Sequence, residues 1–318
     1  MAYSQNKISI VWDAIRLARP IHWTKNLSIF AALIFSGSLY QRGNFIIVFW
    51  AFLAFNLATS STYIFNDILD SARDKLHPIK KNRPIAKGTI SKSVGLIMAC
   101  LLALIALLLA NTLSYLFFLA ILAYLLLQIS YSLFLKNLHI IDILIIASGF
   151  VIRVYSGAFV IDAHLSVWFL LCVVSAALFL ASGKRRAELG AVEKPGLTRK
   201  SLSRYSKELL NSYVTMFGNA AWMSWALFTF FEPTRVPPNL WLFLAELSKT
   251  TTINKLLMVT IPVAIFGIMR YENLIFEGRS EAPEKLLLTD SALVASVVVW
   301  VGMVIFILYG GVPIGSLI

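Results

Sequence analysis

The chain has 318 residues, of which 58% are hydrophobic and only 14% are charged, and its formal net charge is +12. A soluble domain is typically about 45–50% apolar and about 25% charged, so this composition excludes an ordinary soluble globular protein. The positive charge does not indicate nucleic-acid binding, because it is confined to a few segments between apolar runs.

Apolar runs recur along the whole chain after one amphipathic segment. Residues 8–20 (ISIVWDAIRLARP) predict a helix that lies on the membrane surface. Runs of about 18 apolar residues predict helical spans, because a helix satisfies its own backbone hydrogen bonds in lipid. About nine spans are expected, near residues 27–40, 45–65, 93–110, 113–130, 138–161, 165–182, 211–230, 253–269 and 291–310. The expected fold class is an all-α integral membrane protein, with one transmembrane domain over 1–318 and an interfacial segment at 1–26.

Basic residues are distributed unequally between the connections that join these spans. One set of alternate connections holds 23 of the 28 lysines and arginines, the other set holds 4, and Arg153 lies inside a span. Positively charged loops remain on the cytoplasmic side of a membrane. The asymmetry therefore predicts a cell-membrane protein with a cytoplasmic N-terminus and an outer C-terminus. The one sizeable outer loop is expected over residues 231–250.

The second expected span ends in an acidic pattern, Asn66-Asp67-x-x-Asp70-x-x-x-Asp74. Each residue of a helix advances by about 100°, so the three carboxylates fall within roughly 60° of one another. Like charges this close repel one another unless a cation joins them, and Mg²⁺ prefers oxygen ligands. The pattern predicts a Mg²⁺ site for a diphosphate at the cytoplasmic surface. The plainer alternative is a solvated helix end that pairs with neighbouring basic residues.

The segment that follows the aspartates is basic and conformationally restricted. It reads HPIKKNRPIAKG over residues 77–88 and contains Lys80, Arg83 and two prolines. Prolines and a glycine predict a shaped loop rather than a flexible one. Cations beside an acidic metal site are what a metal-bridged polyphosphate requires. Arg83 is the strongest candidate, although charge that only fixes membrane orientation explains about half of the lysines.

A second candidate region covers residues 131–157. It contains Tyr131, Lys136, Asp142 and Arg153, and Asp142 and Arg153 are about three helical turns apart. A charge inside a membrane span is costly, so Arg153 indicates a functional site or a structural ion pair with a neighbouring helix. Glycines at 149 and 157 predict close helix packing around Arg153.

A third candidate region ends the sixth expected span at Lys184-Arg185-Arg186. Three consecutive cations point around a helix, so not all three can bind one ligand. Ordinary charge at the end of a span is an equal alternative. Lys25, directly before the first span, can reach the same cytoplasmic face.

Together these residues resemble the UbiA superfamily of intramembrane prenyltransferases, whose first aspartate-rich motif follows the pattern at 66–74. The second aspartate-rich motif of that superfamily is replaced here by GKRRAEL at 183–189. In this respect the chain resembles one branch, the decaprenyl-phosphate phosphoribosyltransferases. The segments that carry this resemblance are RPIHWTKN (19–26), residues 66–88, residues 131–158, residues 166–189 and RYENLIFEGRSEAPEKLLLTD (270–290).

The resemblance implies nine helices around a cavity that opens to the cytoplasm, and the transfer of phosphoribose from phosphoribosyl pyrophosphate to a polyprenyl phosphate. It implies Mg²⁺ as the cofactor and a trimer as a possible assembly. Asp67, Asp70 and Asp74 would hold the metal, and Asp67, Asp70 and Arg83 would act on the leaving pyrophosphate. The expected substrate-binding residues are Lys25, Asn66, Lys80, Tyr131, Lys136, Asp142, Arg153, Lys184, Arg185 and Arg186.

Two other functions are compatible with parts of the sequence. An aromatic polyprenyltransferase of quinone or haem biosynthesis would use a prenyl diphosphate, but it needs a second Asp-x-x-x-Asp after the sixth span. A transporter could use Arg153 and Asp142 as an ion path, but it predicts internal repeats and leaves the aspartates at 67–74 unexplained.

Overall fold

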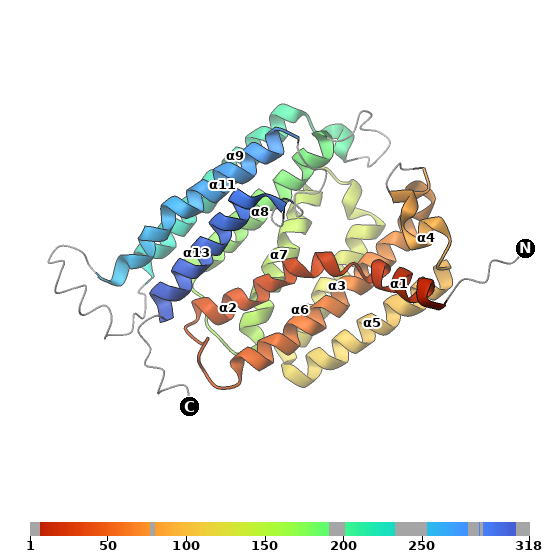
Figure 1. Ribbon diagram of the computed structural model, residues 1–318, viewed down its shortest axis with the longest axis horizontal. Helices are drawn as coiled ribbons and strands as arrows, with labels where there is room; N and C mark the ends of the chain where they lie inside the picture. The colour runs from red at the N-terminus through yellow and green to blue at the C-terminus, as the bar shows by residue number, and fades with distance from the viewer. Residues whose placement is uncertain are drawn as a thin grey trace, which may run out of the picture. The chain divides into compact units, whose positions relative to one another are not determined.

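The computed structural model describes residues 7–76, 80–190, 201–232, 253–278, 286 and 289–309, and every regular element in these ranges is a helix (Figure 1). Seven helices in this part of the chain are long and apolar enough to cross a membrane. They are α3 (Asn44–Asp74), α5 (Lys92–Leu113), α6 (Tyr115–Leu133), α7 (Ile141–Val160), α8 (Val167–Gly190), the segment Lys255–Phe276 and α13 (Ser291–Tyr309). The all-helical, multi-pass membrane class expected from the sequence is confirmed at this level.

The remaining elements are shorter or less apolar. They are α1 (Lys7–Ala18), the 3₁₀ helix η1 (Pro20–Ile29), α2 (Phe30–Phe35), η2 (Lys80–Asn82), α4 (Pro84–Lys87), η3 (Leu135–Asn137), η5 (Leu202–Arg204), α9 (Lys207–Phe231), and η6 (Ile253–Thr260), which leads into α11 (Ile261–Phe276). Helix α9 is long enough for a span, but its most apolar stretch is less apolar than the corresponding stretch of each of the seven.

The largest difference from the predicted elements is at residues 27–40. A single span was expected there, whereas the structure has η1, the six-residue α2 and a turn with left-handed glycines at 37 and 43. Proline at the start of η1 and the polar side chains within it favour this interruption. Residues 233–250 of the expected outer loop, the basic residues at 191–200 and residues 77–79 lie outside the described residues, and Phe231 still belongs to α9.

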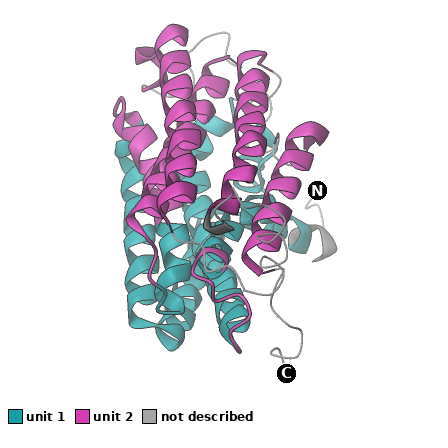
Figure 2. Cartoon of the chain, turned by 90° about the vertical axis from the view of Figure 1, so that its left-hand side faces the viewer, with its two compact units in different colours: residues 1–33, 43–136, 152–163 teal, residues 34–42, 137–151, 164–318 magenta. Residues whose placement is uncertain are grey.

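The chain divides into two compact units, coloured separately in Figure 2. Unit 1 contains residues 1–33, 43–136 and 152–163, and unit 2 contains residues 34–42, 137–151 and 164–318. Helix α7 therefore contributes its first half to unit 2 and its second half to unit 1.

In unit 1, α3 packs against α5 and α6. One of its apolar clusters, drawn from α1, α3, the α4 region and α5, comprises Leu17, Ile64, Ile85, Ile90 and Ala99. In unit 2, α8 packs along α9, and α11 packs on α9 and α13. One apolar cluster of unit 2 joins the α8 and α9 ends to the start of α7, and it contains Ile143, Ala181, Leu189, Leu202 and Leu210. Within each unit, these clusters fix helix ends on which candidate residues lie.

Local sequence signals account for several helix boundaries. Ser91 and Ser206 cap α5 and α9, because each side-chain oxygen accepts a hydrogen bond from a backbone N–H three residues later. Gly157 confirms the expected close packing: a Cβ at this position would lie 2.0 Å from the Ile29 carbonyl oxygen. Only glycine therefore permits the approach of α7 to η1.

Candidate active site

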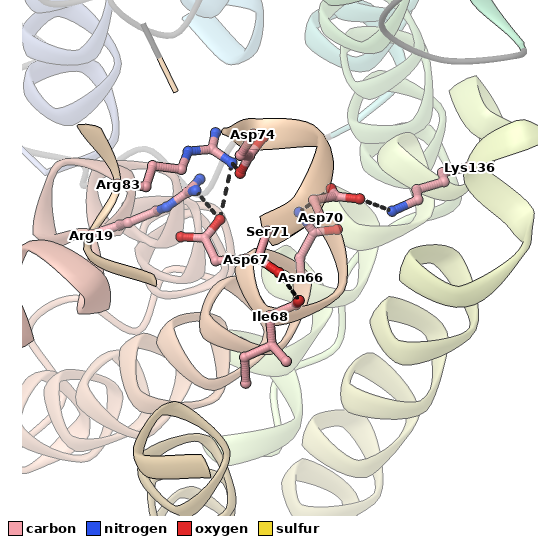
Figure 3. A network of polar contacts seen from close by, with 9 residues as sticks. All are labelled: Arg19, Asn66, Asp67, Ile68, Asp70, Ser71, Asp74, Arg83 and Lys136. Atoms are coloured by element: carbon pink, nitrogen blue, oxygen red, sulfur yellow. Dashed lines mark hydrogen bonds and ion pairs between the residues drawn. The ribbon is translucent and has the colours of Figure 1, made fainter. Parts of the chain in front are cut away.

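The three aspartates of the acidic motif lie on the last turns of α3, and their side chains divide between two sets of partners (Figure 3). Asp67 Oδ1 accepts from Arg19 Nη2 at 2.5 Å and from Arg83 Nη1 at 3.0 Å. Arg83 Nη1 also donates to Asp74 Oδ2 at 2.6 Å. Asp67 and Asp74 therefore share one nitrogen of the Arg83 guanidinium group as their hydrogen-bond donor.

The remaining aspartate has other partners. Lys136 Nζ lies 2.7 Å from Asp70 Oδ1, and the amide of Asn66 donates to Asp70 Oδ2 at 3.0 Å. Lys136 comes from η3, after α6, and its side chain is buried. We call Asp67, Asp70 and Asp74 with their cation partners Arg19, Arg83 and Lys136 the charge cluster; all six belong to unit 1.

Burial makes these cations necessary. The Asp67 side chain is only 2% exposed, and a carboxylate this buried is costly unless it is paired and hydrogen-bonded. The charge cluster supplies three negative and three positive side chains. Arg19, Arg83 and Lys136 therefore do more than set the orientation of the protein in the membrane.

The charge cluster has donor atoms suitable for Mg²⁺. Within the described ranges, no three His, Cys, Asp or Glu side chains are arranged to share one metal ion. The three aspartates, which the sequence analysis expected to bind one metal together, are therefore not arranged in that way here. Asp67 and Asp74 nevertheless already contact one shared cationic group, at 3.0 and 2.6 Å. Their oxygens, with those of Asn66 and Asp70 on adjacent turns, are the hard ligands that Mg²⁺ prefers.

Arg153 lies in a separate buried network of unit 1. Its Nε donates to Asn26 Oδ1 at 2.7 Å and its Nη2 to the Tyr124 hydroxyl at 3.0 Å. The Asn26 amide donates in turn to Asn56 and Thr59 of α3, at 2.7 and 3.2 Å. The guanidinium also lies 5.1 Å from the centre of the Tyr124 ring. Arg153 therefore ties α7 and α6 to η1 and α3.

Lys25 lies in η1, next to Asn26, and its side chain is half-buried. The same segment is held by Trp23, whose indole N–H donates to Ser60 Oγ at 3.0 Å. A ten-residue 3₁₀ helix is unusually long, because 3₁₀ runs beyond three or four residues are uncommon. Side-chain anchors from α3 and α7 explain how η1 persists. Lys80 in η2 and Tyr131 in α6 are also half-buried residues of unit 1.

Asp142 and Arg185 form an ion pair inside unit 2. Arg185 Nε lies 2.7 Å from Asp142 Oδ2, and the two side chains are 1% and 0% exposed. Tyr205 donates its hydroxyl hydrogen to Asp142 Oδ1 at 2.7 Å and accepts from the Ile140 backbone N–H at 2.9 Å. Arg185 also pairs with Glu188. Removal of one partner would leave a buried charge, at a cost of about 3–5 kcal/mol.

Burial and the hydrogen bond to Asp142 raise the pKa of Tyr205 far above the usual value for tyrosine. Its hydroxyl therefore remains a hydrogen-bond donor throughout the neutral range.

The other two cations of the third candidate region lie in different surroundings. Arg186 Nε donates to Asn211 Oδ1 at 2.5 Å, and its guanidinium lies 5.7 Å from the Phe276 ring centre. Lys184 is half-buried on α8. The expectation that the three consecutive cations point in different directions agrees with the different partners of Arg185 and Arg186.

The structure also adds residues that the sequence pattern did not single out. Arg19 contacts Asp67, Asn26 connects Arg153 to α3, and Tyr205 holds Asp142. Arg19 and Asn26 are the first and last residues of RPIHWTKN, one of the segments that carry the resemblance, whereas the sequence analysis contained no signal for Tyr205.

A profile of the UbiA prenyltransferase family matches residues 26–187, the part that carries the acidic motif. The chain is 33% identical over 301 residues to a decaprenyl-phosphate phosphoribosyltransferase of Mycolicibacterium smegmatis, covering 93% of this chain and 92% of the relative. The chain belongs to the UbiA prenyltransferase family. A protein of the same name from Corynebacterium glutamicum is 32% identical and covers 93% of this chain and 86% of its own length.

The fold of this UbiA family member agrees with the sequence relationship. A solved UbiA homolog from Archaeoglobus fulgidus, bound to GPP and Mg²⁺, superposes with a TM-score of 0.67 at 17% identity, over 92% of this chain and 96% of the homolog. At this identity the likeness establishes the fold alone.

Proposed function

We propose that this protein transfers 5-phosphoribose from phosphoribosyl pyrophosphate to a polyprenyl phosphate of the decaprenyl type, with Mg²⁺, and releases pyrophosphate. The 33% identity to a decaprenyl-phosphate phosphoribosyltransferase over 93% of the chain carries this proposal. The charge cluster supports it, because its aspartates offer oxygen ligands for a metal and its cations offer hydrogen bonds to phosphate.

The aspartates and Arg83 are assigned to the leaving group. Asp67, Asp70 and Asp74, with Asn66, provide the metal-binding oxygens, and a bound Mg²⁺ would supply positive charge to the departing pyrophosphate. Arg83 donates hydrogen bonds to the same group as its C1–O bond breaks. A phosphate oxygen of the lipid forms the new bond to C1 with inversion. No general base is needed, since a phosphate monoester is largely ionised near pH 7.

Lys25, Lys80, Tyr131 and Lys136 remain proposed substrate-binding residues of unit 1. Lys184 and Arg186 remain candidates for the 5-phosphate or the acceptor phosphate.

We assign Arg153, Asp142 and Arg185 positioning roles instead of the substrate contacts first expected. Arg153 holds the η1 segment that carries Lys25, through its bond to Asn26. Asp142 and Arg185 neutralise each other in a buried pair and brace the end of α8.

We also propose nine membrane crossings with a cytoplasmic N-terminus and active site. The ten residues of η1 at about 2.0 Å each and the six of α2 at about 1.5 Å each give roughly 29 Å when they run end to end, close to the thickness of a bilayer core. They supply the first crossing, and α9 adds one to the seven long apolar helices. The excess of basic residues on one set of loops supports the orientation.

The function is tested with purified full-length protein in lipid nanodiscs. Phosphoribosyl pyrophosphate labelled in the ribose, a polyprenyl phosphate and Mg²⁺ should yield an organic-soluble labelled lipid and one equivalent of pyrophosphate. A matched reaction with a prenyl diphosphate and an aromatic acceptor should give no product. Consumption of the prenyl diphosphate but not of the sugar donor would establish the aromatic prenyltransferase alternative.

A further inference from the structure

Arg19 has a backbone conformation that its sequence position disfavours. It connects α1 to η1 with φ 53° and ψ 61°, in the left-handed region, and it precedes Pro20. L-residues other than glycine, asparagine and aspartate rarely adopt this conformation, and a residue before proline favours extended backbone. Such positions persist where the surroundings fix them, and they concentrate at ligand-binding sites. Here the conformation accompanies an Arg19 side chain directed at α3 (Figure 3).

The Arg19 side chain shares a single acceptor with Arg83. Both guanidinium groups donate to Asp67 Oδ1, at 2.5 and 3.0 Å, and Arg83 donates to Asp74 as well. Arg83 alone therefore already gives Asp67 a cationic partner. Arg19 is an additional cation at a carboxylate that the proposed function assigns to metal binding.

The balance of charge in the charge cluster couples metal and anion binding. A bare Mg²⁺ that binds Asp67 Oδ1 competes there with the guanidinium groups of Arg19 and Arg83. A displaced Arg83 keeps its bond to Asp74, whereas a displaced Arg19 loses its carboxylate. When a diphosphate arrives with the metal, Arg19 can exchange the carboxylate oxygen for a phosphate oxygen. The metal then neutralises Asp67, and the diphosphate neutralises Arg19. Mg²⁺ and the diphosphate should therefore bind more tightly together than either binds alone.

We propose that Arg19 is a further diphosphate-binding residue, which transfers its hydrogen bonds from Asp67 to the donor's phosphates as metal and diphosphate bind together. This inference rests on the proposed function, because it takes the donor to be a diphosphate.

The geometry of Arg19 allows this exchange. Its side chain is 18% exposed, whereas that of Asp67 is 2% exposed, so the guanidinium lies at the open side of the ion pair. The guanidinium carbon also lies 5.0 Å from the centre of the Tyr63 ring, which supports the cation independently of Asp67. A planar guanidinium carries five N–H donors and binds phosphate with two of them at once.

The test measures binding rather than turnover. Full-length protein in nanodiscs is titrated with Mg²⁺ alone by calorimetry, and with labelled inorganic pyrophosphate at saturating Mg²⁺. In Arg19→Gln, Mg²⁺ alone should bind several-fold more tightly, because only one of the two guanidinium groups that compete for Asp67, that of Arg83, remains. Pyrophosphate should bind about 10- to 100-fold more weakly, which corresponds to one charge-assisted interaction. These opposite signs distinguish exchange from a bracing role.

Arg16→Gln is the matched control, because it removes the same charge from an exposed position on α1. Both of its affinities should equal those of the wild type. If Arg19→Gln changes both affinities in the same direction, or changes neither, Arg19 only braces α1 against α3 and the proposal is overturned.

Arg19→Lys decides the matter should Arg19→Gln fail to fold. Several-fold weaker pyrophosphate binding with an unchanged Mg²⁺ affinity supports the proposal, because an ammonium group lacks the paired donors. Wild-type pyrophosphate binding contradicts it. Pyrophosphate is common to every diphosphate donor, so this test can succeed even if the sugar-transfer assay shows that the proposed donor is wrong.

Discussion

Single residues of the charge cluster show how a membrane protein can keep three aspartates close together without a high electrostatic cost. Each carboxylate lies 2.5–3.0 Å from a positively charged side chain. These side chains are Arg19 at the α1–η1 junction, Arg83 at the start of α4 and Lys136 in η3. A cation already bridges Asp67 and Asp74. Under the proposed function, metal and phosphate would therefore replace existing partners instead of entering a preformed acidic pocket.

Loss of the carboxylates proposed to bind the metal should strongly reduce transfer. Asp67→Asn combined with Asp70→Asn keeps the size of both side chains and removes two negative charges. We expect the initial rate of labelled lipid formation to fall by at least about 10²-fold, a magnitude typical for loss of electrostatic stabilisation of a leaving group. Asp13→Asn on α1 should retain the wild-type rate. A double variant with near wild-type activity would show that these aspartates do not hold a required metal.

The Tyr205–Asp142 hydrogen bond should be visible in the pH dependence of stability. The folded-state pKa of Tyr205 is raised above the unfolded value near 10, so its contribution is complete below about pH 10 and is lost as the pH rises above it. Tyr205→Phe should lower the melting temperature by a few degrees at pH 7, since Asp142 loses a buried donor. Its melting temperature should also fall less than that of the wild type between pH 9.5 and 11. Parallel curves would contradict this assignment.

At the scale of secondary-structure elements, the irregular segment η1 organises unit 1. It follows the left-handed Arg19, contains Lys25, and is held by side chains of α3 and α7 through Trp23 and Asn26. A continuous α-helix would rotate these side chains away from their present partners. The interruption of the first apolar run therefore has a structural purpose that its hydropathy does not reveal.

The contact between α7 and η1 gives a sharp packing prediction. Gly157→Ala would place a methyl group 2.0 Å from the Ile29 carbonyl oxygen, so the backbone must move. We expect a loss of several degrees in melting temperature, measured by intrinsic fluorescence in detergent. Gly302→Ala on α13 is the matched control, because a Cβ there meets nothing within 4 Å and alanine is the better helix former. Equal effects of the two substitutions would show that the close approach does not exist in solution.

At the scale of the whole molecule, the proposed topology can be tested by chemical labelling. In a protein without its native cysteines Cys100 and Cys172, Lys87→Cys and Arg42→Cys each add one thiol at an exposed position. A membrane-impermeant maleimide added to intact cells should label Arg42→Cys and should label Lys87→Cys only after the cells are permeabilised. The reverse pattern would invert the orientation and place the charge cluster on the outer side.

Much of this architecture follows from local sequence properties. The expected spans at 45–65, 93–110, 113–130 and 138–161 correspond to α3, α5, α6 and α7, because apolar runs of that length must form helices in lipid. The ends of the spans were less predictable. Helix α8 continues to Gly190, beyond the expected span at 165–182, since Arg185 and Arg186 in its last turns find partners elsewhere in unit 2.

The sequence by itself determined the helical class and the location of the acidic motif, since hydropathy and 3.6-residue periodicity are properties of neighbouring residues. Only the tertiary structure decided which cation neutralises which acid. Arg19 contacts Asp67 across 48 residues, Lys136 contacts Asp70 across 66, and Arg153 contacts Asn26 across 127. No local pattern encodes such pairs, because they depend on how separate helices pack.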